Sequence, residues 1–296
     1  MKQLNVVLPD GSMQDIVTGL MVRAGLRPIM EKKRTKQAKV EVSWINQVAF
    51  QRPQEIPKLL NSGSFDVAVA GQDWIKNWGF IFEELLVLPI GRSGIRKPVK
   101  IVLAVKKESG FKNLQALPLN CEIATEYVHL AQSFLSDSGR PDICVVPSYG
   151  NTENKIEFGA VGIVDITESG NSLRENGLEI IYEIMESNTV VVANAAALAD
   201  PDRRLLIDRF VRLIKGAFQA SNYVMITANV PKSSLESAVK IMGGLKGATI
   251  SGLTTKGWFV LQSAVLKEKE HKIIFELLEI GVTDIIINRE ISLVMS

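Results

Sequence analysis

A regular alternation of strand-like and helix-like segments constrains the fold of this chain more than any other feature. Up to Asn222, short apolar runs such as 65–71 (FDVAVAG) and 99–105 (VKIVLAV) alternate with amphipathic stretches such as 128–139. An uninterrupted apolar strand is typical of a sheet that is covered on both faces, and strand–helix alternation is typical of open α/β sheets. The sequence therefore predicts an α/β protein, with two such lobes in this part of the chain.

After Asn222 the pattern changes. Six segments follow in the order strand, helix, strand, strand, helix, strand, which is the order of the ferredoxin-like βαββαβ unit. A chain of 296 residues is long enough for two or three domains. We expect lobe I to comprise residues 1–95 with 185–218, lobe II to comprise 96–184, and the ferredoxin-like domain to comprise 219–296.

Charge and cysteine content argue against several classes of function. The 34 basic and 32 acidic residues leave a net charge of +2, so we expect no nucleic-acid partner, but a small molecule or another subunit. Cys121 and Cys144 lie in apolar, strand-like settings and predict buried free thiols. Since His129 and His271 are the only histidines, a structural zinc site is not expected. No segment has the length of a membrane span or the apolar core of a signal peptide, which predicts a cytoplasmic protein.

The segment GIVDITESGNSLRENGLEII, residues 162–181, carries the most chemical information. A short apolar strand ends at Asp165, and ligands of open α/β sheets bind outside the carboxyl ends of strands. The following loop offers backbone N–H groups, the hydroxyls of Ser169 and Ser172, and a close approach at Gly170, which together suit a phosphate. A carboxylate before the loop suits a ribose diol. The segment predicts a ribose-phosphate site, and an ordinary capped turn is the alternative.

Five segments of the chain resemble motifs of the ATP phosphoribosyltransferase family and occur in the same order as in that family. Its members catalyse the first step of histidine biosynthesis. VDITESGNSLRENGL resembles the family's phosphoribosyl-diphosphate loop, and the C-terminal unit resembles the regulatory domain of the long form. The resemblance covers nearly the whole chain, and the two α/β lobes resemble those of periplasmic-type binding proteins. The segments are 50–75, 123–135, 149–159, 164–178 and, in the C-terminal unit, 223–231 with 257–265.

The resemblance implies a magnesium-dependent displacement between ATP and 5-phosphoribosyl 1-diphosphate. N1 of adenine would attack C1 of the ribose and diphosphate would leave, which requires positioned reactants and cations rather than a protein nucleophile. The implied catalytic residues are Arg52, Glu153 and Asp165, of which Glu153 and Asp165 also hold Mg²⁺. The implied phosphoribosyl-diphosphate loop consists of Asp165, Thr167, Glu168, Ser169, Gly170, Asn171, Ser172 and Leu173.

The same resemblance implies a nucleotide pocket made by Gly71, Asp73 and Tyr127. Each implied role has an ordinary structural alternative. Asp73 could be a cap at the end of a strand, and Tyr127 could pack in the core. Arg52 could be a solvated arginine at the start of a helix.

The chain departs from the family pattern in the turn after its first strand. The family usually carries a basic residue there, whereas this chain has Asp10-Gly11-Ser12. Cations from the segment 91–100 could compensate, and the candidates are Arg92, Arg96 and Lys97. Two alternatives stay open: a phosphoribosyltransferase with a different acceptor base, and a non-catalytic regulatory protein that binds a small molecule.

The resemblance also implies a homo-oligomer, a hexamer or a dimer, and histidine as an allosteric inhibitor bound by residues from about 219 onward. Ser251 and Thr254 lie in polar turns and are candidate contacts for histidine, or ordinary surface residues. Alternating apolar positions of the C-terminal unit could be buried between subunits or could fill its own core: Val224, Ile226, Phe259 and Leu261.

Overall fold

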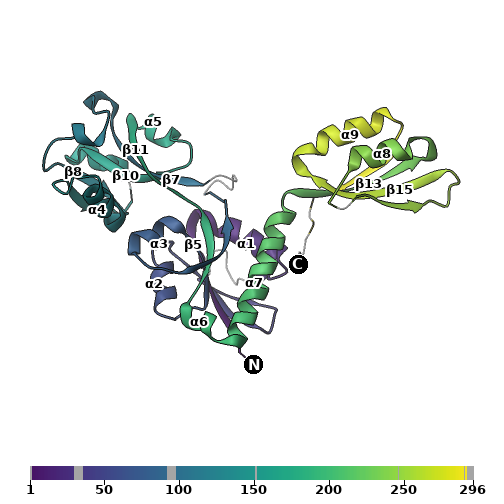
Figure 1. Ribbon diagram of the computed structural model, residues 1–296, viewed down its shortest axis with the longest axis horizontal. Coiled ribbons are helices and arrows are strands. Elements are labelled where there is room, and N and C mark those ends of the chain that lie inside the picture. Colours follow the sequence, from purple (N-terminus) through teal and green to yellow (C-terminus); the bar gives the residue numbers. More distant parts are fainter. Residues whose placement is uncertain are drawn as a thin grey trace. The chain divides into compact units, whose positions relative to one another are not determined.

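The chain forms two compact units, whose secondary structure is labelled in Figure 1. The computed structural model describes residues 2–29, 36–91, 98–150, 152–245, 247–289 and 291. The first unit comprises Met1–Gly19 with Pro28–Val211, and the second comprises Leu20–Arg27 with Arg212–Ser296.

A seven-stranded sheet forms one part of the first unit, with the order β2-β3-β4-β1-β5-β12-β6. Strands β4, β1 and β5 are parallel, whereas β12 runs antiparallel between β5 and β6. The central strands are almost completely buried, as the uninterrupted apolar runs predicted. The strands are β1 (Leu4–Pro9), β2 (Pro28–Ile29), β3 (Gln37–Val40), β4 (Ile45–Gln51), β5 (Val67–Gly71), β6 (Glu83–Leu88) and β12 (Thr189–Ala193).

Helices of different lengths follow the strands of this sheet. Pro57 lies at the first positions of α2 (Ile56–Asn61), where a missing N–H costs nothing, and Ile56 and Leu60 pack on the sheet. Gly79 ends α3 (Gln72–Trp78) in the left-handed conformation, with a φ of 67°. The other helices are η1 (Gly11–Met13), α1 (Gln14–Arg23), α6 (Ala195–Ala199) and α7 (Pro201–Ala220).

A five-stranded sheet with the order β11-β7-β10-β8-β9 forms the other part of the first unit. Strands β10, β8 and β9 are parallel, and β7 and β11 run antiparallel to their neighbours. Leu103, Ile123 and Leu130 belong to its core. The elements are β7 (Val99–Lys106), η2 (Lys107–Ser109), η3 (Leu114–Ala116), β8 (Glu122–Thr125), α4 (Val128–Asp137), β9 (Cys144–Pro147), η4 (Thr152–Phe158), β10 (Gly162–Thr167), α5 (Asn171–Glu175) and β11 (Leu178–Ser187).

The two cysteines differ in their environment. Both are free, and Cys121 is buried as predicted, which raises the pKa of its thiol. Cys144 is exposed, so the prediction of a buried thiol was wrong at this position. The reason is that β9 is the edge strand of the five-stranded sheet, so one side of an apolar strand still faces solvent.

The second unit confirms the predicted βαββαβ order. Its four-stranded antiparallel sheet has the order β14-β15-β13-β16. The elements are β13 (Tyr223–Pro231), η5 (Lys232–Ser234), α8 (Leu235–Met242), β14 (Thr249–Gly252), β15 (Trp258–Leu266), η6 (Lys267–Lys269), α9 (Glu270–Glu279) and β16 (Thr283–Asn288).

The core of the second unit decides between the two roles considered for its alternating apolar positions. Val224, Ile226 and Leu261 are 0% exposed and pack against residues of α8 and α9, so they fill the core of this unit. Phe259 is half-buried. The oligomeric state and the domain limits 1–95 with 185–218, 96–184 and 219–296 stay predictions. In the described part of the chain, no helix is long and apolar enough to cross a membrane.

Candidate functional site

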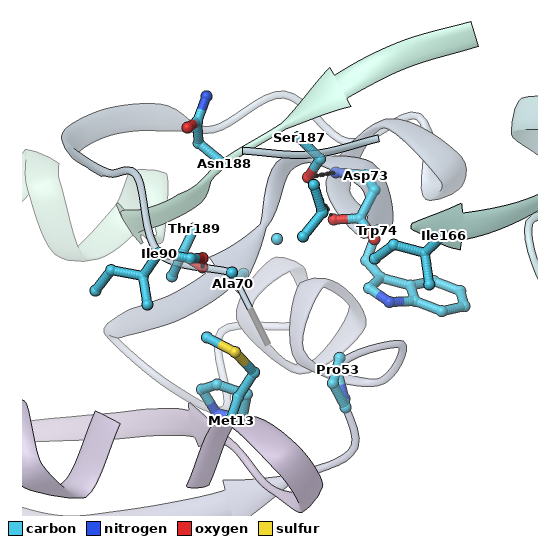
Figure 2. A pocket seen from close by; sticks show the side chains of 14 residues that line it. Met13, Pro53, Ala70, Asp73, Trp74, Ile90, Ile166, Ser187, Asn188 and Thr189 are labelled. Atoms are coloured by element: carbon cyan, nitrogen blue, oxygen red, sulfur yellow. Dashed lines mark hydrogen bonds between the residues drawn. The ribbon is translucent and has the colours of Figure 1, made fainter. Parts of the chain in front are cut away.

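A pocket lies at the carboxyl ends of β1, β4 and β5, the edge at which open α/β sheets bind ligands (Figure 2). Its volume is about 60 Å³, which is less than a nucleotide needs, so a ligand of that size must extend beyond it. Both sheets contribute to its wall. The lining residues are Pro9, Met13, Pro53, Ala70, Gly71, Asp73, Trp74, Ile90, Gly91, Val99, Ile166, Ser187, Asn188 and Thr189.

Asp73 is the charged residue among the described residues of this wall, and its carboxylate is fully engaged. The residue is 3% exposed in the first turn of α3. Ser187 Oγ donates a hydrogen bond to Asp73 Oδ1 at 2.6 Å (Figure 2), and Tyr127 Oη donates to Asp73 Oδ2 at 2.8 Å. Gly71 is required beside it, because a Cβ atom at this position would overlap with Asp73 Oδ1. A buried carboxylate therefore joins three separate segments of the chain.

Tyr127 lies in the hydrophobic core of the five-stranded sheet. It is 2% exposed, and its ring stacks on Trp74 with 4.4 Å between the ring centroids. Tyr127 therefore packs in the core, which is the structural alternative considered for it from the sequence. Its contact with a nucleotide stays a prediction, because the ring would first have to become accessible.

Helices α3 and α4 make further contacts that connect the two sheets. Asn77 Oδ1 of α3 accepts a hydrogen bond from the backbone N of Leu130 at 3.1 Å. The rings of Trp78 and His129 lie 5.4 Å apart. We call these contacts, together with the hydrogen bonds of Asp73 to Tyr127 and Ser187, the α3–α4 bridge. The sequence did not predict the bridge, since its members are far apart in the chain.

The predicted phosphoribosyl-diphosphate loop begins within β10, which runs to Thr167, two residues beyond the strand end predicted at Asp165. Asp165 is half-buried near the end of that strand, and its Oδ1 accepts from the backbone N of Ile166 at 2.7 Å. Gly170 has a φ of 74°, as its predicted role requires, and its N–H donates to Thr167 Oγ1 at 2.8 Å. Leu173 is 2% exposed and anchors the loop in the core beneath it. The loop is therefore shaped by its own hydrogen bonds.

Two hydroxyl residues of the loop face solvent. Ser169 and Ser172 are exposed, whereas Glu168 is half-buried. Ser169 Oγ accepts a long hydrogen bond, 3.4 Å, from the N–H of Asn171. Because α5 has only five residues, the donors available to an anion are hydroxyls and loop amides rather than the dipole of a long helix.

The sequence pattern does not identify Arg174 as a site residue. Its Nη2 donates to the carbonyl oxygen of Ser169 at 2.8 Å and also to Oδ1 of Asn171. The side chain thus folds back over the loop from the end of α5. One feature of the sequence could have indicated a role for Arg174: it is the only basic residue in the segment 162–181.

The remaining predicted residues lie on different sheets of the first unit. Glu153 is half-buried in η4, and Arg52 is exposed directly after β4. Among the described residues Arg52 has no ion-pair partner. Glu126 was missed: its Oε1 accepts from the N–H of Gly150 at 2.8 Å and ties the end of β8 to the turn after β9.

The acidic first turn is paired with a cation from another part of the chain, which the sequence did not reveal. Lys36 Nζ pairs with Oδ2 of Asp10, which is 8% exposed. Oδ1 of Asp10 is buried without a hydrogen-bond partner among the residues that the structure describes. The compensating cations expected at Arg92, Arg96 or Lys97 lie outside the described residues.

Protein families related to this chain were identified by comparison with known proteins. The family described as ATP phosphoribosyltransferase matches residues 52–216, and the one described as HisG, C-terminal domain, matches residues 220–289. An ATP phosphoribosyltransferase of Chlorobium phaeobacteroides is 34% identical over 94% of this chain and 93% of its own length. ATP phosphoribosyltransferase 1 of Geobacter sulfurreducens is 30% identical over 96% of each chain.

One solved structure has a fold similar to that of a large part of this chain. The "ATP phosphoribosyl transferase (HisG:HisZ) complex from Thermotoga maritima" matches 73% of this chain and 99% of that chain, with a TM-score of 0.62 and 23% identity. At this identity the likeness concerns the fold alone. Together with the sheets and the family matches, it confirms the predicted α/β fold with a C-terminal domain.

Proposed function

Because the chain belongs to the ATP phosphoribosyltransferase family, we propose that it condenses ATP with 5-phosphoribosyl 1-diphosphate, the first step of histidine biosynthesis. The products are 1-(5-phosphoribosyl)-ATP and diphosphate. The observation that carries the proposal is the loop after β10, which lies inside the matched range 52–216. It combines the carboxylate of Asp165, near the end of β10, with a left-handed glycine and exposed hydroxyls.

The reaction forms one bond and breaks one. The lone pair of adenine N1 forms a bond to C1 of the ribose, and the C1–O bond breaks so that diphosphate leaves with its electron pair. We assign the 5-phosphate to the loop 167–173 and the ribose hydroxyls to Asp165, whose carboxylate accepts hydrogen bonds. Arg52 faces the leaving diphosphate as an exposed cation. No protein nucleophile is needed, and positioning accounts for a large part of the rate.

Members of this family use a divalent metal, which we assign as Mg²⁺ held by Glu153 and Asp165. No group of three His, Cys, Asp or Glu side chains suitable for a metal occurs among the described residues. Two carboxylates nevertheless fit Mg²⁺, which is commonly held by one or two carboxylates together with substrate phosphates and water. When bound, the ion would neutralise charge on the leaving diphosphate.

We assign the nucleotide to the pocket beside Gly71 and Asp73. Tyr127 is part of this assignment through its hydrogen bond to Asp73. The pocket lies at the carboxyl ends of three strands, and Lys36 brings positive charge to the neighbouring first turn. We also propose histidine as the effector, assembly into a homo-oligomer, and a cytoplasmic location.

A nucleotide panel tests the proposed reaction. The purified chain is mixed with 5-phosphoribosyl 1-diphosphate, Mg²⁺ and one nucleotide at a time, and released diphosphate is measured. We expect release with ATP, together with a new product that contains both substrates. Release with another base instead of ATP would favour a different acceptor, and no release with any nucleotide would refute a transferase.

A further inference from the structure

We infer that Arg174 binds the 5-phosphate of the phosphoribosyl substrate and holds the loop 165–173 in its binding shape. The inference rests on the proposed function and adds a residue to it. Arg174 lies on α5, outside the loop residues assigned above, and its side chain returns to that loop.

The charge of the loop region requires a cation. A phosphate monoester carries nearly two negative charges at neutral pH, yet the segment 162–181 already holds four carboxylates, those of Asp165, Glu168, Glu175 and Glu179. Arg174 is the one basic residue between positions 162 and 181. Without its guanidinium, the region would repel the group that it is proposed to bind.

The geometry of Arg174 leaves most of its donors available. Both hydrogen bonds of the guanidinium to the protein come from Nη2, one to Ser169 and one to Asn171. In the part of the chain that the structure describes, Nη1 and Nε have no acceptor, and no carboxylate pairs with this side chain. A planar guanidinium that is held by one nitrogen can still offer the other two to phosphate oxygens.

Nη1 of Arg174 lies beside Gly170, the residue of the loop with a left-handed backbone. A Cβ atom placed on Gly170 would lie 2.9 Å from Nη1 of Arg174. The guanidinium therefore lies directly against the glycine whose left-handed backbone lets a phosphate approach. Ser172 is exposed and lies on the same helix as Arg174, two residues before it, so hydroxyl and cation are presented by one short segment.

Arg174→Gln and Arg174→Lys test this inference in the full-length protein. Steady-state kinetics give KM for each substrate, and calorimetry gives Kd for ribose 5-phosphate and for inorganic diphosphate. We expect Arg174→Gln to raise KM for 5-phosphoribosyl 1-diphosphate and Kd for ribose 5-phosphate on the order of 10- to 100-fold, as for loss of a charged hydrogen bond. KM for ATP and Kd for diphosphate should change little. Arg174→Lys keeps the charge, so its KM for 5-phosphoribosyl 1-diphosphate and its Kd for ribose 5-phosphate should lie between those of the wild type and those of Arg174→Gln.

The matched control is Arg204→Gln, which removes a half-buried arginine of α7 that pairs with Glu83 and Asp208. It should leave all four constants unchanged. Unchanged KM and Kd in Arg174→Gln would overturn the inference about Arg174. This outcome would not refute the proposed function if the wild type is active. Equal weakening of ribose 5-phosphate and diphosphate, with no recovery in Arg174→Lys, would also overturn it, since a merely disordered loop behaves in that way. Binding of ribose 5-phosphate can be measured without turnover. It therefore tests the role of Arg174 in phosphate binding even if the wild type transfers nothing to ATP.

Discussion

Asp165 is the single side chain on which the proposed chemistry depends most, because it is assigned to both the ribose and the metal. We expect Asp165→Asn to lose most activity while the protein stays folded, since one well-placed charged contact contributes on the order of 2–4 kcal/mol to the transition state. Turnover and circular dichroism are compared with those of Asp137→Asn, a change at an exposed position of α4. Turnover of Asp165→Asn close to that of the wild type would remove this residue from the mechanism.

Gly170 tests the shape of the loop rather than its charge. Its φ of 74° strains any β-branched residue, and a new Cβ would lie 2.9 Å from Arg174 Nη1 and 3.3 Å from Ile180 Cδ1. We expect Gly170→Val to weaken binding of 5-phosphoribosyl 1-diphosphate, measured by calorimetry. Gly139→Val is the matched control, because Gly139 has the same φ of 74° and open space around its Cβ position. Equal affinity in both variants would show that this loop does not hold the phosphate.

Backbone requirements of single residues were predictable from the sequence, whereas partners across the sheet were not. The left-handed Gly170 followed from its place between a strand end and a helical pattern. Lys36 reaches Asp10 only because β3 pairs with β4, with Gln37 opposite Ala49. Sheet register of this kind depends on tertiary packing, and no local pattern specifies it.

At the scale of elements, the α3–α4 bridge joins a helix of the seven-stranded sheet to one of the five-stranded sheet. We expect Tyr127→Phe and Ser187→Ala each to lower the free energy of unfolding by about 1–3 kcal/mol, because each leaves an oxygen of the buried Asp73 carboxylate without its donor. Urea unfolding of each variant measures the loss. Tyr182→Phe, at a half-exposed ring of β11, should cost less than about 0.5 kcal/mol.

The two changes should not be additive in the double variant, because both hydroxyls bind the same carboxylate. A loss in Tyr127→Phe no larger than in the Tyr182→Phe control would mean that the Asp73 hydrogen bond contributes nothing to stability. An unchanged KM for ATP in both bridge variants would further argue that the bridge is purely structural.

Most strands were predictable, but β11 (178–187) was not, for a physical reason. This strand lies at the edge of its sheet, and its register with β7 shifts between Ile180 and Tyr182 and again between Glu183 and Met185. Each bulge inserts an extra residue and breaks the period of two that identifies a half-buried strand. By contrast, β5 is buried on both faces and its apolar run was sufficient.

At the scale of the whole molecule, the order of elements predicted the α/β part and the βαββαβ part, because local periodicity records which faces are buried. It could not predict the pocket, whose wall combines residues from 9 to 189. The C-terminal βαββαβ domain has a complete core of its own. Such a domain can bind an effector without contributing to the chemistry of the first unit.

We therefore expect histidine to bind the full-length protein and to inhibit it, and we expect a chain that ends before Asn222 to lose this inhibition. Inhibition requires that histidine prefer a less active state by a differential free energy of about 1–3 kcal/mol. Ser251 on β14 and Thr254 are both exposed and could contact it, so Ser251→Ala should weaken binding by roughly tenfold at most.

Histidine titration tests this regulation when activity and binding are recorded on the same sample, with alanine as the control ligand and light scattering for the oligomeric state. Binding with inhibition in an oligomer is the expected result. Binding without inhibition would separate the site from control of the first unit. If millimolar histidine neither binds nor slows turnover, regulation by histidine is wrong. A transferase with another acceptor and another effector then becomes the better account, because the acidic first turn at Asp10 already departs from the family there.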